Sequence, residues 1–315
     1  MNSTAENITE APLADDAYYA AVTAAIRAEA AGILASGSVA AVVGYTAGRR
    51  AGTAMPVVIT APDQADRLIF TPACQNNLAL YLTKAKKEVS TRGRLGVVVK
   101  GCDLKALAGL IGENQQKREE LYIIGIACAG VHRAGISASQ PLSPGTIAAK
   151  CRECTVRQPE GTDAVAGTLP QLPELTPLEA QELARLEAMT PAGRWAFWKE
   201  HFTRCIRCLA CRQVCPFCFC EQCLCDRNRP QGIESTPRPA GNMGWHIVRA
   251  MHLTGRCAGC AECERVCPMD IPLNLLNRKM AQEMLQLYGH QAGMAAKDKG
   301  PLNEYKENDD QSFIK

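Results

Sequence analysis

The N-terminal half of the chain alternates between helical and strand-like hydrophobic patterns. Apolar residues recur at helical spacing over residues 15–35, which predicts a helix that ends before Gly37. Short runs rich in β-branched residues predict strands at 39–45, 57–60, 68–70, 95–100 and 121–127. Because strands and helices alternate, we expect an α/β domain with a mainly parallel sheet over residues 1–157.

The segments between these strands contain two further expected helices, at 78–87 and 104–112. The second follows a Gly-Cys-Asp turn at 101–103, in which Asp103 is expected to cap the helix. Cys102 and Cys128 each follow a predicted strand, and the carboxyl ends of parallel strands are where such sheets carry their chemistry.

A change of composition separates this domain from the rest. Residues 158–177 are rich in Pro and Gly and are predicted to be a linker. Thr176 and Glu179 form a capping-box pattern around Pro177, which predicts a helix to residue 188.

The region after the linker has the pattern of a helical domain, expected over residues 178–292. Thr190 and Pro191 open a helix whose aromatic face consists of Trp195, Trp198 and Phe202. Another helix is predicted at 245–253, and the last has an apolar stripe of Leu273, Leu276, Met280, Met284 and Leu287. Residues 293–315 form a charged tail.

Composition narrows the possible functions. The 315 residues are 47% hydrophobic and 21% charged, as in ordinary globular proteins. The net charge of +3 is spread without a dense basic block, so nothing favours nucleic-acid binding. The longest apolar run, 121–131, is too short to cross a membrane, and the N-terminus has no leader pattern. We therefore expect a soluble, cytoplasmic protein without membrane insertion.

The chain contains 17 cysteines, and 12 of them lie between Cys205 and Cys267. In a reducing compartment disulfides do not persist, so this number favours metal ligation. The spacing C-x2-C-x2-C-x3-C-P occurs twice, as Cys205, Cys208, Cys211 and Cys215-Pro216, and as Cys257, Cys260, Cys263 and Cys267-Pro268.

This spacing is typical of proteins with two 4Fe–4S clusters. Three cysteines of one run hold three irons, and the fourth, before Pro, completes the cluster of the other run. One cluster is therefore expected on Cys205, Cys208, Cys211 and Cys267, and the other on Cys257, Cys260, Cys263 and Cys215. Zinc is the alternative, but it explains neither the third cysteine of each run nor the repeated Cys-Pro.

Two further groups of cysteines are candidates. Cys218, Cys220, Cys223 and Cys225 are predicted to hold a further cluster or a zinc ion, between which the spacing does not decide. Cys102, Cys128, Cys151 and Cys154 either share one site or are buried free thiols. Cys74 is expected to be a small buried residue.

Part of the first domain resembles a known family. Residues 97–103, 121–128, 151–154 and 163–167 are similar to the beta subunits of deazaflavin-reducing hydrogenases and formate dehydrogenases. The resemblance spans about 39–167, and it implies a third 4Fe–4S cluster on Cys102, Cys128, Cys151 and Cys154.

A flavin, FAD, beside that cluster is a further implication. However, Phe70 to Cys74 departs from the flavin-binding members, and no G-x-G-x-x-G motif is present. The helical domain resembles the dicluster ferredoxin modules of heterodisulfide-reductase-type proteins and formate dehydrogenase beta subunits.

The resulting expectation is a non-catalytic iron–sulfur subunit that relays electrons. Its partners would be the catalytic subunit of a formate dehydrogenase or hydrogenase, a heterodisulfide-reductase-like flavoprotein, or both. A flavin-containing reductase of a soluble hydride carrier, such as a deazaflavin coenzyme, is one alternative, and a zinc scaffold without redox function is another. No Ser-His-Asp set, catalytic carboxylate pair or phosphate loop is visible in the sequence.

Overall fold

The computed structural model describes residues 11–83, 93–137, 139–294, 300, 301 and 307, and all statements below concern these residues. The chain divides into two compact units. The first, here called the sheet unit, comprises Met1–Leu78, Arg92–Gly101 and Leu121–Ala180. The second, the helical unit, comprises Ala79–Thr91, Cys102–Glu120 and Gln181–Lys315.

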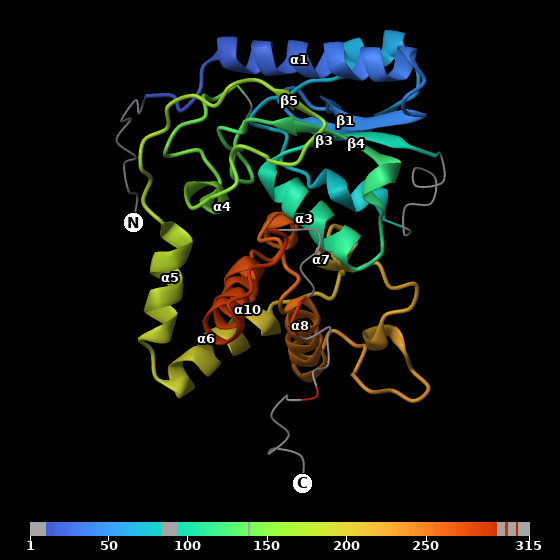
Figure 1. The fold of residues 1–315 in the computed structure, drawn as a ribbon. Coiled ribbons are helices and arrows are strands. Elements are labelled where there is room, and N and C mark those ends of the chain that lie inside the picture. The colour runs from blue at the N-terminus through green and yellow to red at the C-terminus, as the bar shows by residue number, and fades with distance from the viewer. Residues whose placement is uncertain (1–10, 84–92, 138, 295–299, 302–306, 308–315) are drawn as a thin grey trace. The chain divides into compact units, whose positions relative to one another are not determined.

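The sheet unit is built on five strands in the order β2-β1-β3-β4-β5 (Figure 1). The strands are β1 (Ala41–Ala47), β2 (Ala54–Ile59), β3 (Leu95–Val99), β4 (Leu121–Ile126) and β5 (Ala164–Ala166). Strands β1, β3, β4 and β5 are parallel, and only the edge strand β2 pairs antiparallel. The predicted α/β domain with a mainly parallel sheet is confirmed.

Helix α1 (Asp16–Ala35) packs against this sheet through Val22, Ile26 and Ala30, which are almost fully buried (Figure 1). Its N-cap is Asp15, whose carboxylate accepts a hydrogen bond from the Tyr18 backbone N–H at 2.8 Å. The helix lies where the apolar periodicity predicts it, because that periodicity follows its buried face.

The strand predicted at 68–70 is wrong. These residues follow the 3-10 helix η1 (Pro62–Arg67) without joining the sheet as a strand. The backbone N–H of Phe70 donates instead to the Thr23 hydroxyl of α1, at 2.9 Å. The segment keeps one backbone hydrogen bond to β1, from the Ile69 N–H to the Tyr45 carbonyl at 2.9 Å, and a side chain accepts the next N–H.

Two other boundaries differ from expectation. Residues 101–103 are not a turn but the first turn of α3 (Gly101–Gly112), so Asp103 lies inside the helix and not before its first residue. In the helix expected at 78–87, residues 78–82 form the 3-10 helix η2 (Leu78–Leu82), and 84–87 lie outside the described residues.

The stretch expected to be a linker includes strand β5. Next to it, the Asp163 carboxylate accepts a hydrogen bond from the Ile123 backbone N–H at 2.7 Å, which ties this short strand to β4. The predicted capping box, in which the Thr176 side chain would accept from the Glu179 N–H, is replaced by another contact. The backbone N–H groups of Glu179 and Ala180, in the first turn of α5, both donate to the Glu153 carboxylate at 3.0 Å.

The helical unit consists of helices and loops in its described part. Beyond α3, its helices are α5 (Leu178–Glu187), which begins in the sheet unit, α6 (Pro191–Thr203), α7 (Ala210–Gln213), α8 (Pro239–Leu253), α9 (Glu262–Arg265) and α10 (Leu273–Tyr288). Helix α8 packs against α6 and α10, and α7 packs against α9. Their shared core is Phe202, Cys211, Cys225, Trp245, Cys263, Ile271 and Leu273.

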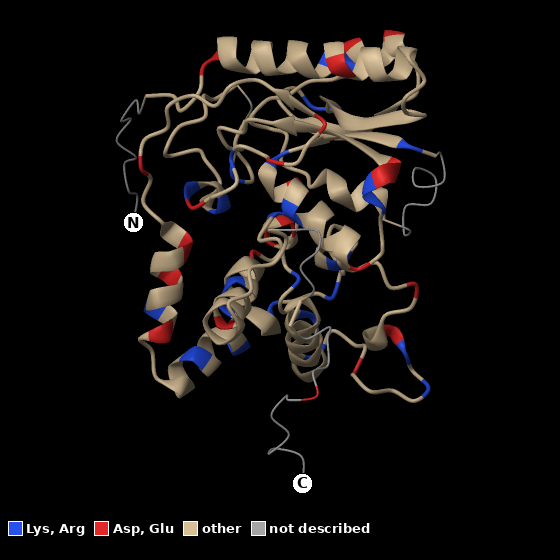
Figure 2. Ribbon diagram, in the orientation of Figure 1, with Lys and Arg blue, Asp and Glu red and all other residues tan. Residues whose placement is uncertain are grey.

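The ends of the predicted apolar faces lie outside that core. Trp198 stacks on Phe202 with ring centroids 5.5 Å apart, whereas Trp195 is 55% exposed. On α10, Leu273 and Met284 are buried, but Leu287 is exposed. Figure 2 shows acidic and basic residues interspersed along α5, where Arg185 pairs with Glu182. Among the described residues, no helix has the length and apolarity that a membrane crossing requires.

A substitution at Gly101 tests the packing of the sheet unit. A Cβ atom at this position would lie 1.7 Å from the carbonyl oxygen of Val156, so Gly101→Ala should lower the free energy of unfolding by about 2 kcal/mol. The matched control is Gly32→Ala in α1, where a Cβ meets nothing within 4 Å and should stabilise the helix by about 0.5–1 kcal/mol. Denaturant midpoints measure both changes. Equal effects of the two substitutions would contradict this packing.

Candidate metal centres

The two cysteine runs form loops with the same backbone shape. In each, the residues on both sides of the second cysteine have positive φ angles. These residues are Arg207 (56°) and Leu209 (59°) in the first loop, and Gly259 (67°) and Ala261 (53°) in the second. Left-handed conformations cost non-glycine residues about 1–2 kcal/mol each. Their recurrence at equivalent positions indicates that the same conformational constraint acts on both loops.

This winding turns backbone N–H groups toward sulfur. The Arg207 N–H donates to the Cys205 Sγ at 3.4 Å, and the Gly259 N–H donates to the Cys257 Sγ at 3.5 Å. Hydrogen bonds of this kind stabilise a sulfur that carries negative charge.

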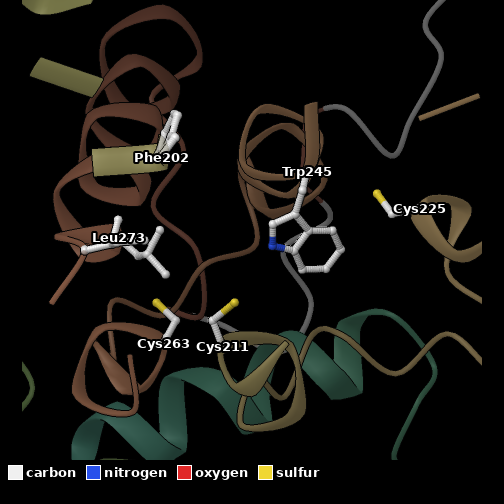
Figure 3. Close-up of a cluster of buried hydrophobic side chains, with 7 residues drawn as sticks. Phe202, Cys211, Cys225, Trp245, Cys263 and Leu273 are labelled. Carbon is white, nitrogen blue, oxygen red and sulfur yellow. The ribbon is translucent and has the colours of Figure 1, made fainter. Parts of the chain in front are cut away.

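The third cysteine of each run lies on a short helix and is buried. Cys211 is on α7 and Cys263 is on α9, and their side chains are 8% and 7% exposed. Figure 3 shows these two side chains beside one another, with Cys211 nearer to Trp245. The contact between α7 and α9 therefore brings the two cysteine runs together.

Cys267, the last cysteine of the second run, lies with the first run. A cavity in the helical unit is lined by Cys205, Cys208, Cys211 and Cys267, together with Pro268, Arg207, His246 and apolar side chains. Burial raises the pKa of the Cys205 thiol, and the nearby Cys267 and Cys208 thiols raise it further. Cys267 thus lines the same cavity as the three cysteines of the first run, although it is distant from them in sequence.

Cys215 has the reciprocal position. Burial is the largest influence on the pKa of Cys257, which is raised, and the neighbouring Cys215 adds to the increase. For Cys263, burial and then the thiols of Cys257 and Cys215 contribute to a pKa of about 12. Cys260 belongs to the same loop. The structure has the arrangement on which the cross-ligation hypothesis depends, and the ligand assignment itself stays a prediction.

Single-ion sites and clusters differ in how they space their ligands. Within the described residues, no three Cys, His, Asp or Glu side chains form a group that could hold one metal ion. A 4Fe–4S cluster spreads four thiolates over four irons, so its ligand sulfurs lie farther apart than those around one zinc ion. The features that bear on cluster binding are the cavity, the loop backbone and the charge around the sulfurs.

One face of α8 covers the cysteine loops, and it carries the polar residues that sequence reasoning missed. Asn242, which is fully buried, donates to the Cys205 carbonyl at 2.7 Å. His246 is 2% exposed and stacks on Phe202, and burial lowers its pKa to about 3, so the ring is neutral. Asn242, His246 and Arg249 recur at spacings of four and three residues, which is the signal that could have identified this face.

The insert with Cys218, Cys220, Cys223 and Cys225 does not converge on one point in the described structure. Cys218 is hydrogen-bonded to Cys215, which lowers the pKa of Cys215. Cys225 is buried in the helical core and has a pKa raised to about 11 by burial and by the neighbouring Cys223. Cys220 is exposed. The predicted metal site on these four residues stays a prediction.

Aromatic and charged contacts hold the start of this insert in place. The Arg256 guanidinium lies 5.6 Å from the centre of the Phe217 ring and 5.5 Å from that of Phe219, and it pairs with Glu113. Because Arg256 directly precedes Cys257, this contact ties the insert to the second cysteine loop.

Three of the N-terminal candidate cysteines belong to the sheet unit. Cys128, two residues after β4, and Cys151, on α4 (Ala149–Arg152), are both buried. Arg157 connects them, because its backbone carbonyl accepts from the Cys128 N–H at 2.8 Å and its guanidinium donates to the Cys151 carbonyl. Cys154 adds to the raised pKa of Cys151, of which burial is the main cause.

Cys102 falls in the helical unit, so the four-cysteine site stays a prediction. Cys74 is fully buried, as expected, and accepts a hydrogen bond from the Thr71 backbone N–H at 3.3 Å. Burial is the main cause of the raised pKa of Tyr19, and the neighbouring Cys74, Cys128 and Cys151 raise this pKa further.

The sheet unit has an open cavity of about 550 Å³, between α1 and the segment after η1. It is lined by Tyr19, Ala20, Thr23, Ala24, Arg27, Ile69, Phe70 and Thr71. Its volume lies within the usual range for small-molecule pockets. Phe70 and Thr71 belong to the segment that departs from the flavin-binding pattern.

The fold and the cysteines define an α/β sheet unit followed by a cysteine-rich helical unit, and known proteins resemble part of this chain. No family model matches it. Over 97 residues, 31% of the chain, it is 33% identical to the F420-dependent formate dehydrogenase subunit beta of Methanocaldococcus jannaschii. It is 26% identical, also over 97 residues, to the F420-dependent formate dehydrogenase 1 subunit beta of Methanococcus maripaludis.

These matches are partial. The chain spans about a quarter of the length of the two relatives, 25% and 24%. A solved structure of the F420-reducing NiFe hydrogenase complex from Methanosarcina barkeri, a xenon derivative, aligns with a TM-score of 0.29 at 15% identity. That alignment covers 35% of this chain and 41% of the other.

The positive φ angles of the cysteine loops can be tested directly. Ala261→Gly should raise the free energy of unfolding by about 1 kcal/mol, because glycine adopts the left-handed conformation without strain. The matched control is Ala210→Gly in α7, where the residue is helical and glycine should cost about 0.5–1 kcal/mol. Denaturant midpoints of the two variants should move in opposite directions. Destabilisation by both substitutions would show that Ala261 is not strained.

Proposed function

We propose that this chain is an iron–sulfur electron-transfer subunit, of the beta type, in a formate dehydrogenase or hydrogenase complex. The observation that carries the proposal is the exchange of the fourth cysteines. Cys267 lines one cavity with the first cysteine loop, and Cys215 neighbours two thiols of the second. Isolated buried thiols have no need of this arrangement, whereas two interlocked clusters require it.

Two 4Fe–4S clusters would be held by the eight cysteines of the two runs. Cys205, Cys208, Cys211 and Cys267 would hold the first, and Cys257, Cys260, Cys263 and Cys215 would hold the second. When bound, such clusters supply one-electron transfer. Buried side chains such as Trp245 and Phe202 would keep water away from the clusters.

The type of complex in this proposal depends on the relatives. Two proteins named as beta subunits of F420-dependent formate dehydrogenases match 97 residues of this chain. A third 4Fe–4S cluster on Cys102, Cys128, Cys151 and Cys154 would accept electrons from, or pass them to, the other two. The partners would be a catalytic subunit of a formate dehydrogenase or hydrogenase and a heterodisulfide-reductase-like flavoprotein. The insert from Cys218 to Cys225 would hold a further cluster or a zinc ion.

A second candidate is a reductase in its own right, with FAD in the sheet unit acting on a soluble hydride carrier such as a deazaflavin. The cavity beside Tyr19 and Phe70 favours it, because its volume suits a small molecule and its walls include aromatic rings. Bound flavin that is reduced by the carrier without a partner protein would favour this function over the first.

Serine substitutions of single cysteines test the cross-ligation. Because Cys267 would complete the cluster of the first loop, Cys267→Ser should weaken the same electron paramagnetic resonance signal that Cys208→Ser weakens. Cys215→Ser should instead reproduce the loss caused by Cys260→Ser. The measurement is the spectrum of each dithionite-reduced variant, purified without oxygen.

The matched control is Cys74→Ser, a buried cysteine outside both runs, which should keep both signals. If the spectrum of Cys267→Ser matches that of Cys260→Ser, each run binds its own cluster and the cross-ligation is refuted.

A further inference from the structure

Arg249 is a buried cation between the two cysteine runs. It lies on α8, and its side chain is 5% exposed. Its guanidinium donates to the Cys211 carbonyl at 3.2 Å, and its Nε atom has no hydrogen-bond partner among the described residues. Arg249 thus contacts the backbone of the first run, while its Nε–H group has no acceptor among the described residues.

The charged groups around Arg249 belong to both runs. Burial lowers its pKa, but the thiolate forms of Cys263, Cys215, Cys218 and Cys211 outweigh burial, so the pKa is raised. Cys211 belongs to the proposed first cluster, and Cys215 and Cys263 belong to the proposed second cluster. The same guanidinium therefore lies in the electrostatic field of both ligand sets.

Three other buried or half-buried arginines of the helical unit have carboxylate partners. Arg212 pairs with Asp226, Arg256 with Glu113, and Arg265 with Glu262. In the described part of the chain, Arg249 makes no such ion pair, although it is the least exposed of the four.

Burying a guanidinium is unfavourable unless an anion compensates its positive charge. A 4Fe–4S cluster with four thiolate ligands carries a net negative charge, and its one-electron reduction adds one further negative charge. A neighbouring positive charge therefore stabilises the reduced cluster more than the oxidised one, which raises its potential.

We propose that Arg249 is a positioning residue whose single positive charge is shared by the two clusters and raises the reduction potential of both. The inference rests on the proposed function, because it requires the two clusters. It assigns to α8 a role in tuning the electron path that the cysteine spacing alone does not indicate.

The test is a redox titration, followed by electron paramagnetic resonance, of the full chain purified without oxygen. Arg249→Gln removes the charge and should shift both cluster potentials to more negative values, with iron content unchanged. Arg249→Lys keeps the charge and should restore potentials close to those of the original protein. The control is Arg194→Gln in α6, which removes a positive charge whose guanidinium donates to the carbonyls of Glu187 and Met189 and should shift neither potential.

Each outcome decides the question. Arg249→Gln with both clusters bound and only one potential shifted, or none, overturns the inference. If Arg249→Gln loses the clusters while Arg249→Lys keeps them, the charge acts on cluster binding and not on the potentials, and the inference fails. If Arg249→Lys also loses them, the side chain acts through its shape and the inference fails. Absence of iron from the original protein would instead refute the proposed function.

Discussion

The packing of α7 against α9 is the contact on which the helical unit depends. Each of these short helices carries the third cysteine of its run, so their contact fixes the distance between the two cysteine loops. It also brings Cys267 to the first loop and Cys215 to the second. The two runs are far apart in sequence, but their third cysteines lie in one shared core. Most buried residues of this core have sulfur-containing or aromatic side chains, beside the aliphatic Ile271 and Leu273.

Helix α8 fits this core because its buried face combines apolar and polar side chains. Trp245 lies beside Cys211 (Figure 3), and Asn242 fixes the backbone at Cys205. An all-apolar helix would bury more hydrophobic area but would leave the loop carbonyls without donors. The polar residues of α8 satisfy those groups, and Arg249 adds a positive charge where negatively charged clusters would lie.

The sequence predicted the features that follow from local periodicity or fixed spacing. The parallel sheet and α1 follow from apolar periodicity, whereas the ligation of the first cluster by Cys267, inferred from the repeated Cys-Pro, stays a prediction. The segment 68–70 was misread because its strand-like pattern does not reveal that Thr23, distant in sequence, binds the Phe70 N–H. The buried face of α8 was missed for a related reason, since Asn242, His246 and Arg249 resemble a solvent-exposed face until the loops that cover them are known.

Iron, acid-labile sulfide and zinc content of the protein purified without oxygen tests the central claim most directly. Two cross-ligated clusters predict at least about eight iron atoms and about eight sulfides per chain, with more if the N-terminal cysteines hold a third. Stoichiometric zinc without iron or sulfide would contradict the account. In that case no iron–sulfur clusters would exist for the exchanged fourth cysteines to ligate or for the charge of Arg249 to influence.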